Sequence, residues 1–326
     1  MQSVPRETPI KNKNNNLTIL MSLSETLVSL LAIQPWEKVL VLTDFKKEKI
    51  GRKIFEELKN KANVKFFIMK TRSRDGKEPT KRARELMLEA DVIFAVTLYS
   101  ITHTKTTREC VEKGKRIASM PNLSEFSIKE GGLTADYEQV REITERIFNL
   151  VKNSKKIRVI AKNGTNVEFL VESREWYKDD GWLNKKGSLG NLPAGEVFIA
   201  PIEESVSGKI VFDSFPLSKS KLILEVKNGK AYEVRNDVEK VEKIFSQLGE
   251  KARQIAEFGI GTNPKAKIIG NALEDEKVFG TCHFALGNNI NFGGINDVPF
   301  HADGIIERPT IIADEKIIMK DGRLIR

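Results

Sequence analysis

The feature that most constrains the fold is a regular alternation of short apolar runs with charged amphipathic segments over residues 38–120. Strands that alternate with helices form parallel sheets with helices on both faces. We therefore predict an N-terminal parallel α/β domain. The predicted strands are 38–44, 64–69, 91–97 and 116–120, and the predicted helices between them are 46–60, 77–89 and 104–113.

The second half of the chain is marked by Asn-Gly or Asp-Gly pairs at 163–164, 228–229 and 321–322, each between two apolar runs. Such pairs favour two-residue hairpin turns, because both central residues need a positive φ. The pattern predicts a mainly antiparallel β (α+β) C-terminal domain. An exception is 237–258, where apolar residues recur at helical spacing, so we predict a helix that delivers Glu257 near its C-terminal end.

The length of 326 residues suggests two domains with separate cores. We predict a disordered arm over 1–16, an α/β domain over 17–152 and a metal-binding domain over 153–326. Residues 17–33 are apolar but interrupted by polar side chains, which indicates an amphipathic helix and not a membrane span.

Composition describes an ordinary globular protein, with 40% hydrophobic and 30% charged residues. Two distant cysteines form no disulfide framework and fit the reducing cytosol, so we predict a cytoplasmic protein. The net charge of +9 raises a nucleotide- or nucleic-acid-binding module as an alternative. The basic residues are mixed with acids and no phosphate-binding glycine motif is present, so solvated helix faces are the simpler interpretation.

Two of the three histidines, His283 and His301, fall within a glycine-rich stretch at 280–303. Asp303 follows His301 by two positions, and on a strand such residues point to the same face. Imidazole with several carboxylates suits Zn, Mn or Co. The alternative is a pair of core histidines. Clustering among glycines, which suit close backbone approach to a ligand, makes a metal site an equal possibility.

Further candidates lie elsewhere along the chain. Glu196 is the one acid in a stretch punctuated by Gly and Pro, where a buried carboxylate needs a cation and a solvated loop acid is the alternative. His103 follows the third predicted strand, at the sheet edge where ligands bind, and either meets substrate or hydrogen-bonds within its loop. Cys282 beside His283 is predicted to be a packed small residue.

Several motifs together resemble the thermophilic metalloaminopeptidases, the family of aminopeptidases T and S. These motifs are N-L-P-A-G-E-V-F-I-A-P at 191–201, A-E-F-G-I-G-T-N-P at 256–264, D-E-K-V-F-G-T-C-H-F-A-L-G at 275–287 and H-A-D at 301–303. The resemblance implies two divalent ions, Zn, Co, Mn or Mg. It places their ligands at Glu196, Glu257, His283, His301 and Asp303, with Glu276 as a ligand or an acid that supports one.

The resemblance also implies a homodimer that removes the N-terminal residue from peptides with a free N-terminus. A metal-activated water would attack the peptide carbonyl, with Glu257 or Glu276 as the catalytic base. Ile290 stands where the family has a tyrosine. This departure raises the alternative of a metal-binding member whose hydrolytic activity is lost or altered. No nucleic-acid or membrane partner is expected.

Overall fold

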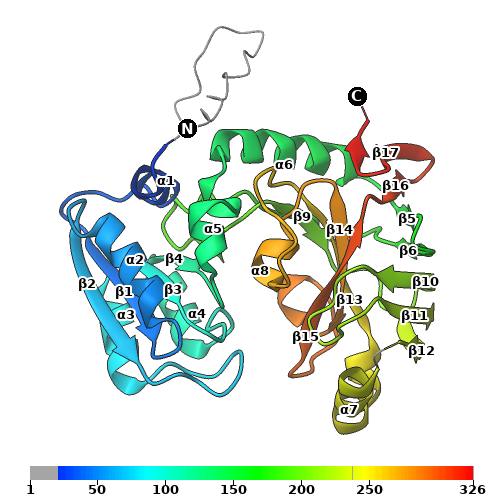
Figure 1. Ribbon diagram of the computed structural model, residues 1–326, viewed down its shortest axis with the longest axis horizontal. Coiled ribbons are helices and arrows are strands. Elements are labelled where there is room, and N and C mark those ends of the chain that lie inside the picture. Colours follow the sequence, from blue (N-terminus) through cyan, green and yellow to red (C-terminus); the bar gives the residue numbers. More distant parts are fainter. Residues whose placement is uncertain (1–20, 237, 326) are drawn as a thin grey trace, which may run out of the picture.

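The computed structural model describes residues 21–236 and 238–325. The predicted disordered arm at 1–16 lies outside these residues. Figure 1 shows two lobes side by side, an N-terminal lobe built around β1–β4 and a C-terminal lobe that carries most of the remaining strands. Glu274 and Asn271 of the second lobe bind backbone atoms of the first, since Glu274 Oε1 accepts from Gly132 N at 2.6 Å and Asn271 Nδ2 donates to Asn122 O at 2.8 Å.

The first lobe is a parallel sheet in the order β2-β1-β3-β4-β8, as the alternating pattern predicts. β8 joins this sheet although it lies in the second half of the chain. The division at residues 152 and 153 stays a prediction. The strands are β1 (Lys38–Asp44), β2 (Asn63–Met69), β3 (Val92–Val96), β4 (Arg116–Ser119) and β8 (Leu189–Asn191); the helices are α1 (Leu23–Leu30), α2 (Glu48–Leu58), α3 (Lys81–Glu89), α4 (Lys105–Glu112), α5 (Glu125–Lys129) and η1 (Gly132–Thr134).

The second lobe has an eight-stranded sheet in the order β12-β11-β10-β6-β5-β16-β17-β18. The three predicted hairpins are confirmed as β5–β6, β11–β12 and β17–β18. Asn228 and Asp321 have the positive φ values, 50° and 48°, that tight hairpin turns require. The strands are β5 (Lys156–Ile160), β6 (Asn166–Leu170), β10 (Ser207–Phe212), β11 (Leu222–Lys227), β12 (Lys230–Arg235), β16 (Thr310–Ala313), β17 (Lys316–Lys320) and β18 (Arg323–Leu324).

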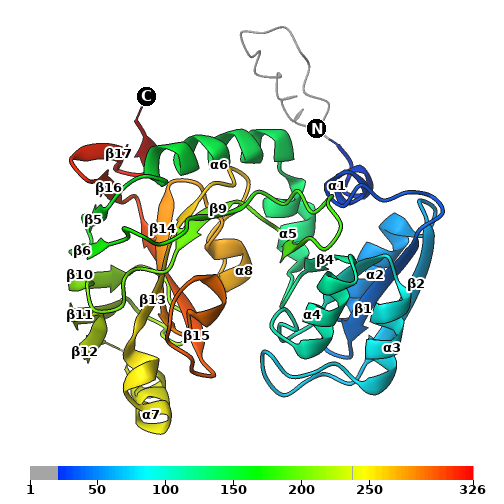
Figure 2. The same ribbon diagram turned by 180° about the vertical axis from the view of Figure 1, so that it is seen from behind.

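The second lobe has another antiparallel sheet, in the order β15-β14-β13-β9-β7. One face of this sheet packs against the eight-stranded sheet through aromatic side chains. The Phe169 ring lies 5.0 Å from that of Phe258 and 5.6 Å from that of Phe284. The predicted helix α6 (Tyr137–Val151) runs along this lobe in both views (Figures 1 and 2). The strands are β7 (Tyr177–Asp179), β9 (Glu196–Ile199), β13 (Ile255–Gly261), β14 (Thr281–Gly287) and β15 (His301–Glu307).

The helix predicted over 237–258 is wrong in its second half. The helix α7 ends at Leu248 (Glu239–Leu248), and the next residue, Gly249, has a positive φ of 71° that favours glycine and is incompatible with a continued helix. The short helix η2 (Gly249–Arg253) follows, and Glu257 then lies on strand β13. The sequence shows a helical spacing beyond Gly249 only because strand β13 is apolar on both of its faces.

Over the described residues, no helix is long and apolar enough to cross a membrane.

Candidate metal centre

Strand register brings five predicted ligands to one face of the second sheet. Glu257 on β13 pairs with Ala285 on β14, and Ala285 pairs with Asp303 on β15. One row further along, Gly259 pairs with His283. Register partners point to the same face of a sheet. The side chains of Glu257 and Asp303 can therefore approach each other across Ala285, which is small. We call Glu196, Glu257, His283, His301 and Asp303 the polar cluster.

The polar cluster consists of two groups that share Glu257. In the first group, His283 Nε2 lies 3.5 Å from Glu196 Oε2 and 3.5 Å from Glu257 Oε1. In the second group, His301 Nε2 lies 3.4 Å from Glu257 Oε2 and 3.5 Å from Asp303 Oδ1. His283 is fully buried and 33% of the His301 side chain is exposed, so the centre opens to solvent on the His301 side.

Gly259 provides the space for the His283 ring. A Cβ atom at this position would lie 2.1 Å from His283 Nε2 and 2.2 Å from Cε1. Residues 257, 259 and 261 share one face of β13, and the last two are glycines. Both glycines of the G-I-G segment have a packing reason: Gly259 makes room for the His283 ring, and Gly261 for the backbone of Val278, whose carbonyl oxygen would lie 2.2 Å from a Cβ atom there.

Neighbouring groups orient two of the candidate ligands. His301 Nδ1 lies 2.8 Å from the carbonyl oxygen of Asn288 and donates to it, so Nε2 is the ring nitrogen that faces Glu257 and Asp303. Lys277 Nζ donates to Glu196 Oε1 at 2.5 Å, and the other oxygen, Oε2, faces His283. Outer partners of this kind fix the ligands of metal sites.

The buried donor set fits a divalent metal ion. Glu196 Oε2 and both ring nitrogens of His283 are buried and form no hydrogen bond, and buried polar atoms of this kind require a partner. Ligand atoms bonded at about 2.1 Å to one ion lie about 3.0–3.4 Å apart. The observed separations of 3.4–3.5 Å between the nitrogen and oxygen atoms come close to this spacing.

The carboxylates dominate the electrostatics of the centre. Burial alone would lower the pKa of His283, but the carboxylates of Glu257, Glu196 and Asp303 outweigh it and raise this pKa to about 9. Burial likewise opposes the charge of Asp303, yet the neighbouring His301 lowers the pKa of this carboxyl to about 2. A group of acids that draws positive charge onto imidazoles is also one that attracts a metal cation.

Metal affinity is therefore expected to rise with pH. An ion that binds His283 must displace the proton held with a pKa of about 9, so the apparent Co²⁺ affinity should increase by up to about tenfold per pH unit from pH 7 towards that value. In the metal-free protein this raised pKa stabilises the fold fully below the unfolded pKa of about 6.5, and the contribution disappears as the pH rises through 9. Co²⁺ titrations at several pH values measure this dependence. A Co²⁺ affinity that stays the same between pH 7 and pH 9 would contradict the prediction.

Glu276, also predicted as a ligand or base, lies outside both groups of the polar cluster. Its Oε1 lies 2.7 Å from Lys277 Nζ, and burial raises the pKa of its carboxyl to about 8. Sequence reasoning missed Lys277, which is fully buried. In L-E-D-E-K the lysine looks like part of a solvated charge run, and only the apolar V-F directly after it indicates that the segment enters the interior.

The third histidine lies near enough to this centre for its charge to interact with that of His301. His103 lies in the loop between β3 and α4, and its ring interacts electrostatically with His301 of the other lobe. His103 is exposed at the surface, although nearby protein atoms remove part of the water around its ring. This desolvation, together with the positive charge of His301, lowers the pKa of His103. The Phe292 ring lies edge-on to His301 at 6.1 Å between centroids and forms an apolar wall. Ile290, two residues before it, is 46% exposed.

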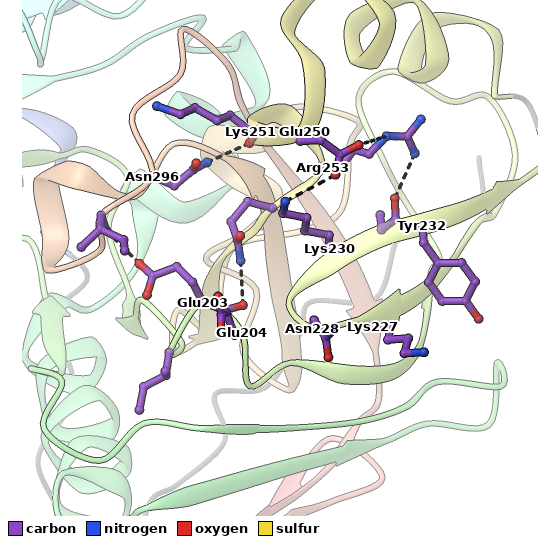
Figure 3. A pocket seen from close by; sticks show the side chains of 14 residues that line it. Glu203, Glu204, Lys227, Asn228, Lys230, Tyr232, Glu250, Lys251, Arg253 and Asn296 are labelled. Carbon is purple, nitrogen blue, oxygen red and sulfur yellow. Dashed lines mark hydrogen bonds and ion pairs between the residues drawn. The ribbon is translucent and has the colours of Figure 1, made fainter.

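A separate cavity of about 1200 Å³ lies beside the β11–β12 hairpin and contains no member of the polar cluster (Figure 3). Its charged lining residues are largely paired with one another or with nearby groups, as Lys230 is with Glu250. Glu203 in its wall accepts from Asn289 Nδ2 at 3.1 Å and from Ile295 N at 2.8 Å. The cavity wall therefore supports the loop that leads to His301.

The fold and the polar cluster together define a candidate metalloenzyme, in which an α/β lobe lies beside a β-sheet lobe that carries the metal centre. A family profile described as NicX: 2,5-dihydroxypyridine 5,6-dioxygenase matches residues 20–326, and the chain belongs to this family. A curated relative, 2,5-dihydroxypyridine 5,6-dioxygenase of Pseudomonas putida KT2440, is 20% identical over 195 residues. This alignment covers 54% of this chain and 56% of the relative, so the chain matches little more than half of that protein's length.

Two solved structures share the fold. The 2,5-dihydroxypyridine dioxygenase of P. putida KT2440 superimposes with a TM-score of 0.78 at 17% identity, over 93% of this chain and 96% of the other. Wild-type AmpT from Thermus thermophilus gives a TM-score of 0.67 at 16% identity, over 93% and 98%. At such identities the likeness establishes the fold alone.

The predicted peptidase activity is wrong. The family match and the curated relative both name a dioxygenase, so the chain belongs to an enzyme family but is not assigned as a hydrolase that acts on peptides. The aminopeptidase resemblance is confirmed only as a structural relation. The roles of Glu257 or Glu276 as a base in peptide hydrolysis lapse with it. The motifs that resemble the aminopeptidases indicate the fold and the members of the polar cluster. Neither a fold nor a set of ligands determines which reaction an enzyme catalyses.

Proposed function

We propose that this protein is a non-haem iron dioxygenase that opens the ring of a hydroxylated N-heteroaromatic compound, with 2,5-dihydroxypyridine as the first candidate substrate. Membership of the NicX family supports this reaction class. The observation that carries the proposal is the pair of imidazoles whose Nε2 atoms lie 3.5 Å and 3.4 Å from the two oxygens of one carboxylate, that of Glu257. Two histidines and one carboxylate form the ligand set typical of non-haem Fe(II) oxygenases.

We propose His283, His301 and Asp303 for that ligand set, drawn from both groups of the polar cluster. Glu257, which the two groups share, lies between the imidazoles, and Glu196 beside His283 is a further candidate carboxylate ligand. Bound Fe(II) would supply the activation of dioxygen. The remaining chemistry belongs to the chain: the partly exposed His301 side admits substrate, and the Phe292 ring offers an apolar wall to a planar ring. Both atoms of O₂ enter the product as one ring bond breaks, so no further reductant is needed. A homodimer, and the absence of nucleic-acid or membrane partners, stay predictions.

The reaction is tested by oxygen uptake. Protein loaded anaerobically with Fe²⁺ and then mixed with aerobic 2,5-dihydroxypyridine should consume one O₂ per substrate as the ring absorbance disappears. Dihydroxybenzenes serve as ring substrates without nitrogen, and a leucine amide serves as a peptidase substrate. An iron-loaded protein that takes up no oxygen with the pyridine or with any related hydroxylated heterocycle would refute the proposal.

We expect His103 to position the substrate or accept a proton from its hydroxyl group, because it belongs to the opposite lobe and its charge interacts with that of His301. His103→Gln should lower kcat/KM for ring opening by about 10²–10⁴-fold, the usual contribution of a positioned acid or base. Its iron content should stay at the parental level, since His103 belongs to neither group of the polar cluster. Parental turnover in the variant would exclude this role.

A further inference from the structure

Lys277 places a fully buried ammonium group beside the polar cluster. Its Nζ lies 2.5 Å from Glu196 Oε1, 2.7 Å from Glu276 Oε1 and 3.8 Å from Asp179 Oδ2. Lysine is almost never fully buried unless it is paired, so this arrangement calls for a reason.

Backbone hydrogen bonds fix Lys277 beside the sheet that carries Glu196. Lys277 follows the short helix α8 (Ala272–Asp275); its N–H donates to Glu274 O at 3.2 Å and its carbonyl oxygen accepts from Asn263 N at 2.8 Å. Asp179 and Glu196 are register partners on the neighbouring strands β7 and β9. The ammonium therefore lies across two adjacent strands, at the end of the sheet face that carries Glu196.

Lys277 divides the two oxygens of Glu196 between different tasks. Oε1 accepts from the ammonium, whereas Oε2 is buried without a hydrogen bond and lies 3.5 Å from His283 Nε2. With Oε1 engaged, one oxygen remains for an ion. We propose that Lys277 is a positioning residue: by holding Oε1 of Glu196, it directs Oε2 towards His283, where a metal ion would bind. This inference rests on metal binding at the proposed centre and is independent of the identity of the ring substrate.

A purely neutralising role for Lys277 predicts a different outcome. An ammonium that only balances buried carboxylates would, when removed, lower the melting temperature of the metal-free protein and leave metal affinity unchanged. A positioning role changes the affinity and the coordination geometry. Co²⁺ reports both properties, because its visible absorption depends on the number and arrangement of its ligands.

The test is a Co²⁺ titration of full-length Lys277→Met, which keeps the unbranched side chain up to the position of Cε and removes the charged group. We expect Co²⁺ to bind about 10–100-fold more weakly, the loss typical of removing an outer partner, with an altered visible spectrum. In a Glu196→Gln background, Lys277→Met should cause no additional loss, because the residue acts through that carboxylate. A parental affinity and spectrum in Lys277→Met would overturn the proposal, as would equal losses in both backgrounds.

A second variant guards against misfolding. Lys277→Met combined with Glu276→Gln removes the ammonium together with one neighbouring charge, and should show the same loss of Co²⁺ affinity; Glu276→Gln alone should bind Co²⁺ as the parent does. A parental affinity in the combined variant would contradict the positioning role. If the parent binds Co²⁺ and opens the ring while Lys277→Met binds normally, only the positioning role fails. If Lys277→Met weakens binding but the parent opens no ring, only the proposed function fails.

Discussion

Gly259→Ala is expected to abolish metal binding although it adds a single methyl group. That methyl carbon would lie 2.1 Å from His283 Nε2, a distance at which the imidazole has to move. The opposite face of the sheet is packed against Phe169, so the strand cannot retreat from the ring. We expect Co²⁺ affinity to fall by more than about 100-fold, beyond the loss usual for outer partners. Overpacking should also cost about 1–3 kcal/mol of folding stability.

The control for this prediction is the double variant Gly259→Ala with His283→Ala. If the clash is with the imidazole alone, removing the ring should restore part of the stability lost in Gly259→Ala, as thermal unfolding of the metal-free proteins would show. Metal binding should stay absent in the double variant. A Gly259→Ala protein that binds Co²⁺ like the parent would mean that His283 does not occupy the described position.

The three histidines are expected to separate into two classes when each is replaced by glutamine. His283→Gln and His301→Gln should each lose Co²⁺ affinity by more than about 100-fold and show no oxygen uptake, because each removes an imidazole from the polar cluster. His103→Gln should bind metal normally and fail only in turnover. Metal titration beside oxygen uptake on the three proteins measures both properties.

This comparison has a matched design, since the three substitutions are chemically identical and differ only in position. Loss of metal from His103→Gln, or its retention in His283→Gln, would contradict the assignment of the centre. His301→Gln is the milder case structurally, because its side chain is one-third exposed whereas His283 is fully buried. The melting temperature of each metal-free variant separates misfolding from loss of a ligand.

The alternating pattern of the first half predicted the parallel sheet because strand and helix periods differ clearly over residues 38–120. Hairpins at 228–229 and 321–322 were predictable because their turns require a positive φ. The helix predicted over 237–258 failed past Gly249, where an apolar strand carries no strict alternation to distinguish it from a helix. The three-residue strands β7 and β8 are too short to leave a periodic signal.

The polar cluster was predictable in its members but not in its use. Histidines and acids with strand spacing indicate a cation, and the structure brings Glu196, Glu257, His283, His301 and Asp303 together. Lys277 was missed because its role depends on a contact between distant segments. His103 was named as a residue that either meets substrate or hydrogen-bonds within its loop, but its interaction with His301 of the other lobe could not be read from the sequence. The reaction could not be deduced, since the same donor set can serve hydrolysis or oxygenation and the choice depends on the metal and the substrate.

The most direct test of the central claim is a crystal of the protein loaded anaerobically with Fe²⁺, with anomalous difference maps calculated at the iron edge. The account predicts a peak bonded to Nε2 of both His283 and His301 and to oxygens of the neighbouring carboxylates, with Lys277 Nζ still on Glu196 Oε1. No peak at the polar cluster, or full iron occupancy elsewhere in the molecule, would contradict it.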